Sequence, residues 1–86
     1  MFGGSTTSDP TKNVNPFNVP TISLRKGSTG SGVKWLQWQL NYLGYNCGTV
    51  DGVFGNNTCI QVKAFQVAKD LEADGIVGAK TRAILI

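Results

Sequence analysis

Apolar residues recur at helical spacing in three parts of the chain. The first apolar stripe follows steps of three and four residues and consists of Val33, Leu36, Leu40 and Leu43. This period predicts one face of a helix. Ser28 or Ser31 is the expected N-terminal cap. Gly44 is the expected stop, with Tyr45 folding back on the last turn.

Two further helices are predicted, from about residue 56 to 69 and from about residue 79 to 85. Their core candidates are Ile60, Val62, Phe65 and Ala68 in the first of them, and Ala83, Ile84 and Ile86 in the other. Thr58 and Gln61 fit a capping box at the start of the 56–69 helix. The periodicity therefore predicts an all-α fold with three helices.

One sequence phrase occurs twice, at residues 51–58 and again at 74–81. Each copy reads Asp-Gly, two apolar residues, Gly, two variable residues and Thr. Asp-Gly favours a tight turn, because Gly tolerates positive φ and the Asp carboxylate accepts from nearby backbone amides. We expect each copy to start a helix and to place its apolar pair in the core (Val53 and Phe54, Ile76 and Val77). The fold class is thus a small three-helix bundle with two Asp-Gly loops.

Residues 1–22 have a different composition from the rest of the chain. They hold all three prolines and few large apolar groups, so they are predicted to form a flexible linker or arm before a folded module at 23–86. Phe17, Val19 and Ile22 are the arm residues able to dock. The N-terminus lacks the pattern of a signal peptide, and no apolar stretch reaches the length of a membrane span. Export information is therefore expected elsewhere.

The composition argues against catalysis and metal binding in this module. The chain has no His and a formal net charge of +3, so His-dependent nucleophile systems are excluded. Of its five acidic residues, Asp51 and Asp74 serve turns, which leaves no convincing glycosidase pair. No catalytic residue, metal site or cofactor is predicted. Cys47 and Cys59 lack metal-ligand spacing, and the sequence allows either a disulfide or two separate small apolar residues.

The ordered motifs from residue 24 to 86 resemble the peptidoglycan-binding domain 1 family. They are Leu24-Arg25-Lys26-Gly27-Ser28, Leu36-Gln37, Leu40-Asn41, Leu43-Gly44-Tyr45, the two Asp-Gly phrases and Phe65-Gln66. Such three-helix modules are appended to bacterial, spore and phage cell-wall hydrolases. Two positions depart from the family pattern: Gln61 stands where Ala is usual, and Ala79 where Pro is frequent.

The resemblance implies a non-catalytic module that targets an attached or partner hydrolase, endolysins included, to its substrate. Its implied partner is peptidoglycan, through the glycan strand or the stem peptide. Its implied location is extracellular or in the cell wall. The recurring family residues are mostly turn and core positions, so they indicate the scaffold and not a ligand site.

A second stripe on the first predicted helix provides candidate ligand contacts. Trp35, Trp38 and Tyr42 follow i, i+3 and i+7 spacing, roughly opposite the aliphatic stripe. Either the arm or another helix covers these rings, or they form a ligand or partner surface. As a ligand site they would stack on sugar rings, with Gln39, Asn41 and Asn46 as hydrogen-bonding neighbours.

Two functions other than wall binding are alternatives for a domain of this kind. The same aromatic stripe would suit a protein-interaction module that docks a catalytic domain. A DNA-binding role needs a basic recognition helix, whereas the 56–69 helix carries only Lys63 and Lys69. No nucleic-acid partner is therefore expected.

Overall fold

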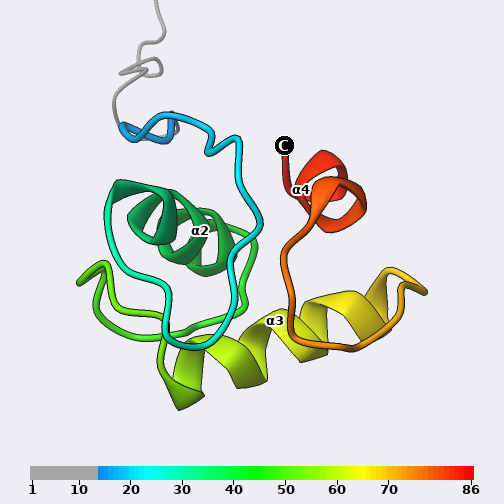
Figure 1. Cartoon of the computed structure of the whole chain (residues 1–86). Helices are drawn as coiled ribbons and strands as arrows, with labels where there is room; N and C mark the ends of the chain where they lie inside the picture. The colour runs from blue at the N-terminus through cyan, green and yellow to red at the C-terminus, as the bar shows by residue number, and fades with distance from the viewer. Residues whose placement is uncertain (1–13) are drawn as a thin grey trace, which may run out of the picture.

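The computed structural model describes residues 14–86 and places three helices there. They are α2 (Ser31–Tyr42), α3 (Asn56–Ala68) and α4 (Ala79–Leu85). In Figure 1, α3 crosses beneath the other two, with α2 above one end and α4 above the other. The predicted all-α, three-helix fold is confirmed. Residues 1–13 of the predicted arm lie outside the described residues, and the domain boundary at residue 22 stays a prediction.

Each helix begins directly after a glycine and not after a capping side chain. The N-cap residues are Gly30, Gly55 and Gly78, and none of the three starts has a side-chain cap hydrogen bond. The predicted serine caps and the Thr58–Gln61 capping box were therefore wrong. The Ser28 hydroxyl instead accepts from the Arg25 backbone N–H, and the Thr58 side chain is buried.

The end of α2 has the predicted geometry. The Gly44 N–H donates to the carbonyl of Asn41, and the Tyr45 N–H returns to the carbonyl of Leu40 at 2.8 Å. The Tyr45 ring then packs edge-on against Phe65 of α3, with 5.4 Å between ring centroids. This helix stop therefore also attaches the following loop to the core.

The core forms where the three helices and both loops meet. Its buried apolar residues are Leu24, Val33, Trp35, Leu36, Leu40, Cys47, Phe54, Val62, Phe65, Val77 and Leu85. Only one member of each loop pair is buried, Phe54 in the first copy and Val77 in the second. The first member of each pair is less buried, since Val53 is exposed and Ile76 is half-buried.

Several predicted core positions are exposed instead. They are Leu43, Ile60, Ala68, Ala83, Ile84 and Ile86. In α4 the buried face is set by Thr81 and Leu85, which are four residues apart. Because each residue turns the helix by about 100°, Ile84 lies about 100° from Leu85 and about 60° from Thr81, at the edge of the buried face. A seven-residue helix shows too few apolar positions for its buried face to be read from sequence.

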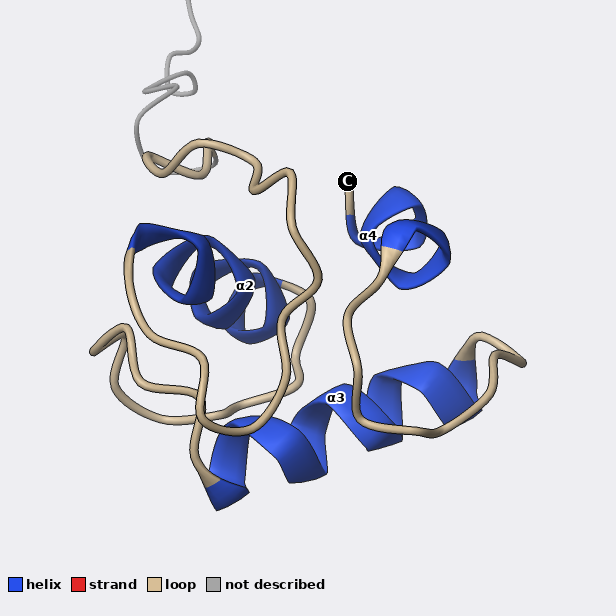
Figure 2. Cartoon of the chain, viewed as in Figure 1, coloured by secondary structure: helices blue, strands red, loops and turns tan. Residues whose placement is uncertain are grey.

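The segment from Leu24 to Gly30 joins the two Asp-Gly loops. Leu24 and Val77 exchange backbone hydrogen bonds of 3.1 and 2.8 Å, and Gly27 donates to Phe54 at 2.9 Å. Gly30 donates to Gly52 at 2.9 Å. Figure 2 shows this stretch as a loop that passes the other loops between the helices. The repeated phrases are thus held together by a single extended segment.

Substitutions at the two turn glycines are expected to differ in cost. Gly52 and Gly75 have φ of 78° and 76°, so Ala is strained at both. A Cβ at Gly52 would also lie 3.2 Å from the backbone oxygen of Gly30, whereas at Gly75 it would meet side chains, Cys59 and Lys63. We expect Gly52→Ala to lower the free energy of unfolding by about 2 kcal/mol and Gly75→Ala by about 1 kcal/mol. Urea denaturation of both variants measures the difference, and equal costs would contradict this packing argument.

Candidate functional site

A buried glutamine organises the first Asp-Gly loop. Gln37 is 1% exposed. Its Nε2 lies 3.0 Å from Asp51 Oδ1, 3.0 Å from the Val53 carbonyl and 3.2 Å from Thr58 Oγ1. Its Oε1 accepts from the Gly52 N–H at 2.9 Å. One side chain of α2 therefore connects the turn, the apolar pair and the start of α3.

Gln66 makes the same set of contacts in the second copy. Its Nε2 lies 3.1 Å from Asp74 Oδ1, 3.0 Å from the Ile76 carbonyl and 3.2 Å from Thr81 Oγ1. Its Oε1 accepts from Gly75 N–H at 3.0 Å. We call these two arrangements the glutamine clamps, Gln37 with residues 51–58 and Gln66 with residues 74–81. In each copy the Asp carboxylate, the Gly N–H and the Thr hydroxyl of the repeated phrase are all bonded to the clamp glutamine. These polar groups hold the loop in place, so the repeat is a scaffold.

The carboxylates of both clamps are held in the ionised form. The Val53 N–H, and then the Gln37 carboxamide, lower the pKa of Asp51. For Asp74 the Ile76 N–H is the main cause of a lowered pKa, and Gln66 adds to it. A glycosidase general acid needs a raised pKa, whereas the pKa values of both of these carboxyls are lowered.

These shifts predict a loss of stability in acid. A lowered pKa in the folded state stabilises the fold above the unfolded value of about 3.9, and this contribution is lost as the pH falls through the folded pKa. We expect the free energy of unfolding to decline below about pH 4. The double variant Asp51→Asn, Asp74→Asn should show a shallower decline in denaturation measured across this pH range. An unchanged acid profile would show that other groups dominate.

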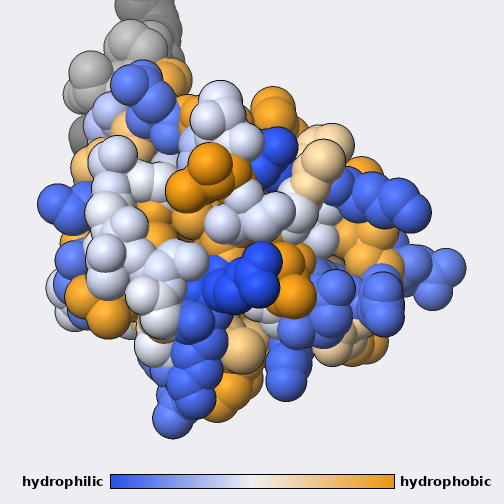
Figure 3. Space-filling view, viewed as in Figure 1, coloured by the Kyte–Doolittle hydropathy of each residue, from blue (hydrophilic) through white to orange (hydrophobic). Residues whose placement is uncertain are grey.

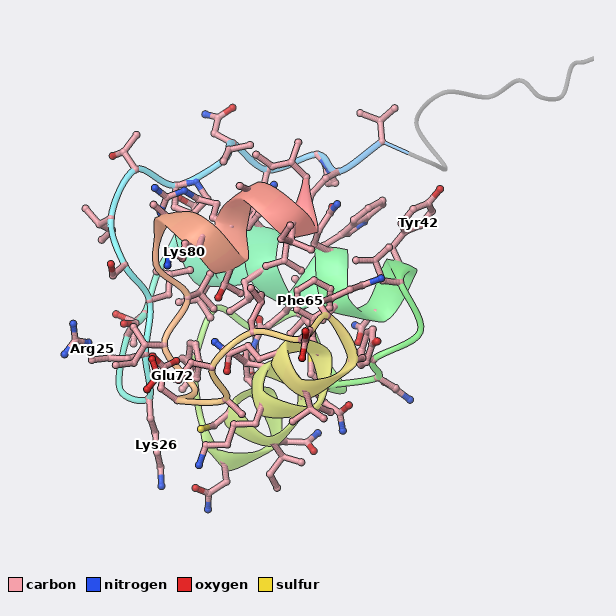
Figure 4. The ribbon with its side chains drawn as sticks, turned by 90° about the vertical axis from the view of Figure 1, so that its right-hand side faces the viewer. Arg25, Lys26, Tyr42, Phe65, Glu72 and Lys80 are labelled. Atoms are coloured by element: carbon pink, nitrogen blue, oxygen red, sulfur yellow. The ribbon has the colours of Figure 1, made fainter. Side chains whose placement is uncertain are left out.

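Two of the three predicted aromatic residues form a stacked pair near the end of α2, in which Trp38 is half-buried and Tyr42 is exposed. Trp38 and Tyr42 stack with 5.2 Å between ring centroids and an interplanar angle of 18°. Tyr42 is 55% exposed, and Figure 4 shows it projecting from the edge of the molecule. Trp35 is only 2% exposed and belongs to the core. The predicted stripe therefore divides into a buried part and an exposed part.

The three predicted polar neighbours also have structural contacts. Gln39 accepts from Asn15 Nδ2 and donates to the Leu85 carbonyl, so it attaches both the arm and α4 to α2. Asn41 donates to Gly48 and accepts from the Cys47 N–H. Asn46 is exposed, and its Oδ1 accepts from the Gly48 N–H. Of the three, Asn46 lies farthest from the ring pair in sequence and shapes the loop after α2.

A shallow hollow of about 300 Å³ lies beside the stacked ring pair. It is lined by Trp38 and Tyr42 of α2 and by Val14, Phe17 and Val19 of the arm. We call this hollow the arm groove. A second hollow of about 370 Å³ touches the same two rings together with Asn41 and Val50. The ring pair is thus accessible from two directions. Figure 3 shows a different face of the chain, on which apolar and hydrophilic side chains are interspersed.

A third hollow, of about 410 Å³, carries charge. Asp70, Glu72 and Asp74 line it together with Lys80. Figure 4 places Glu72 and Lys80 on the opposite side of the molecule from Tyr42. The charged and the aromatic surfaces are therefore separate.

The cysteines are free thiols in separate surroundings. Burial raises the pKa of the Cys47 thiol, whose Sγ lies 3.4 Å from Asn41 Oδ1. Cys59 faces the second loop, because a Cβ on Gly75 would lie 3.1 Å from its Sγ. Within residues 14–86, no group of three or more His, Cys, Asp or Glu is arranged to hold a metal ion. In the same range no helix is long and apolar enough to cross a membrane.

The fold and the site define a class of small all-α domain with a loop scaffold held by buried glutamines and a partly exposed aromatic pair on α2. Residues 29–85 match the family model described as putative peptidoglycan binding domain. This chain belongs to that family. The match covers both glutamine clamps and the ring pair, whereas the arm residues of the groove precede it.

Known relatives agree with this assignment. The chain is 41% identical over 75 residues to a spore cortex-lytic enzyme of Bacillus cereus, with 87% of the chain and 28% of the enzyme covered. It is 44% identical over 77 residues to the spore cortex-lytic enzyme of Bacillus subtilis, covering 81% and 25%. The crystal structure of the SleB N-terminal domain matches with a TM-score of 0.76 and 38% identity, over 79% of this chain and 93% of that one. The chain thus spans about a quarter of the length of these enzymes.

Proposed function

We propose that this chain is the peptidoglycan-targeting module of a cell-wall hydrolase and itself performs no catalysis. The observation that carries the proposal is the stacked Trp38–Tyr42 pair, with its exposed Tyr42 ring, on a domain of this family. Similarity to spore cortex-lytic enzymes supports a hydrolase as the attached or partner domain. An extracellular or cell-wall location follows from that role.

The predicted site residues take different roles in this proposal. Trp38 and Tyr42 contact the polymer, since stacked rings offer apolar faces to sugars and peptide stems. Trp35 supports them from the core, and Gln39 fixes the arm and α4 around them. Asn41 and Asn46 shape the adjacent loop and present carboxamides near its surface.

The benefit of such a module is an increase in effective concentration. A weak and shallow contact that holds a hydrolase on an insoluble polymer makes each later encounter with substrate intramolecular. A deep enclosed pocket is unnecessary for this purpose. The shallow hollows around the ring pair fit such a contact.

Co-sedimentation with purified peptidoglycan tests the proposal. We expect the chain to pellet with the polymer at low and at high salt, because ring stacking depends little on ionic strength. Retention only at low salt would show that the interaction is mainly electrostatic, between a chain of net charge +3 and anionic wall polymers. No retention at either salt concentration, with docking of a hydrolase domain through the same rings, would favour the protein-interaction function instead.

A further inference from the structure

We propose that the arm groove binds an uncharged saccharide ring of the glycan strand and not the stem peptide. This inference rests on the proposed function and names the part of the polymer that the module recognises. It also assigns a ligand-binding wall to arm residues 14–19, which lie outside the family match at 29–85.

The chemistry of the groove favours a neutral ligand. None of the described residues that line it is Lys, Arg, Asp or Glu, and its surface is formed mainly by aromatic and aliphatic side chains. Stem peptides carry free carboxylates, which would lose water there without gaining a charged partner. The C–H faces of N-acetylated sugar rings are uncharged and pack against aromatic rings.

The arm wall is held in position before any ligand arrives. Asn15 Nδ2 donates to the Trp35 carbonyl at 2.9 Å and to Gln39 Oε1 at 3.0 Å. Asn15 Oδ1 accepts from the Phe17 N–H at 3.0 Å, and the half-buried Phe17 ring packs against the core. Because these contacts exist in the free chain, little conformational entropy is lost when the groove is filled.

The polar groups at the groove are already engaged within the protein. Asn15 and Gln39 bond to each other and to backbone groups. The groove therefore offers mainly ring faces and the Tyr42 hydroxyl. Such a surface fits a sugar ring that lays its C–H face on the aromatic side chains, because in a shallow groove the hydroxyl and acetamido groups at the edge of the ring stay in water.

The charged hollow supplies an internal comparison. Asp70, Glu72 and Lys80 offer groups of both signs, as a charged stem peptide would require, yet they lie away from the aromatic pair. A stem peptide bound by this domain would therefore perturb residues 70–81 and not the arm groove. The two ligand classes are distinguishable by where they act.

Isothermal titration with two soluble probes tests the inference. One probe is a soluble oligomer of N-acetylglucosamine, a peptide-free glycan whose rings carry no charge. The other is the stem peptide that an amidase releases from peptidoglycan. We expect saturable binding of the glycan and none of the peptide. Tyr42→Ala should weaken glycan binding about tenfold and Val19→Ser several-fold, since each removes part of one wall.

Ile60→Ala serves as the matched control, because Ile60 is 59% exposed on α3 and does not line the groove. Its glycan affinity should equal that of the unaltered chain. Peptide binding without glycan binding, in a chain that still pellets with peptidoglycan, would overturn the inference and leave the proposed function standing. Glycan binding that Tyr42→Ala leaves unchanged would overturn the location. Failure to pellet at all would instead contradict the proposed function.

Discussion

Gln37→Ala and Gln66→Ala are each expected to lower the free energy of unfolding by about 3 kcal/mol. Each substitution removes a fully buried carboxamide and leaves a cavity. It also removes the acceptor of a buried turn N–H, that of Gly52 or Gly75. A buried donor without a partner costs more free energy than an average hydrogen bond contributes, because it has lost its hydrogen bond to water and has no protein acceptor to replace it.

Gln61→Ala is the control for this pair. Gln61 lies on α3, as Gln66 does, but it is only half-buried. We expect this variant to change the free energy of unfolding by less than about 1 kcal/mol. Urea denaturation followed by circular dichroism compares the three variants. If Gln66→Ala were as mild as Gln61→Ala, the clamps would not organise the fold.

Trp35→Ala and Tyr42→Ala should separate stability from binding. Trp35 is 2% exposed, so its removal is expected to cost about 3 to 5 kcal/mol. Tyr42 is 55% exposed, and among the aromatic residues of 14–86 it stacks only with Trp38, so its removal should cost about 1 kcal/mol. Only the second variant is expected to lose binding to peptidoglycan while it stays folded.

Thermal unfolding and co-sedimentation of the same two preparations provide the measurement. The Tyr42→Ala chain should melt within a few degrees of the unaltered chain and yet remain in the supernatant. If Tyr42→Ala pelleted normally, the exposed ring would have no part in retention. A stable Trp35→Ala chain would contradict its place in the core.

The sequence predicted the scaffold well because its signals are local. Helical periodicity located α2 and α3, and the Asp-Gly phrase indicated each turn and the helix that follows. The Asp51 and Asp74 carboxylates accept from backbone amides as expected. Helix starts were less predictable, because Thr58 and Thr81 bond to a distant glutamine and not to their own helix ends.

The glutamine clamps were missed because their spacing differs between the two copies. Gln37 precedes Asp51 by 14 residues, whereas Gln66 precedes Asp74 by 8. An alignment of the repeat on its Asp-Gly phrase therefore does not extend back to the glutamines. The available signal was a large apolar residue followed by Gln before each copy, Leu36-Gln37 and Phe65-Gln66. Only the folded chain shows that both glutamines reach the same point of each loop.

The aromatic stripe was only partly predictable, because its exposure depends on contacts between segments that are far apart in the sequence. Periodicity places Trp35, Trp38 and Tyr42 along one side of α2, but it contains no information about what lies against them. In the folded chain Asn15 of the arm donates to the Trp35 carbonyl, and Phe17 packs against the core that contains Trp35. The sequence of residues 1–22 identified arm residues able to dock, Phe17 among them, but it did not predict the arm groove.

The most direct test of the account is a chemical-shift titration of the isotopically labelled chain with defined, soluble muropeptides. It shows whether the ligand binds at the aromatic pair and the arm or at the repeated loops. We predict that the largest shifts occur at Trp38, Tyr42 and residues 14–19, with the Gln37 and Gln66 side-chain amides unmoved. Shifts concentrated at residues 51–58 or 70–81 would contradict the account, because the binding surface would then be the repeat itself.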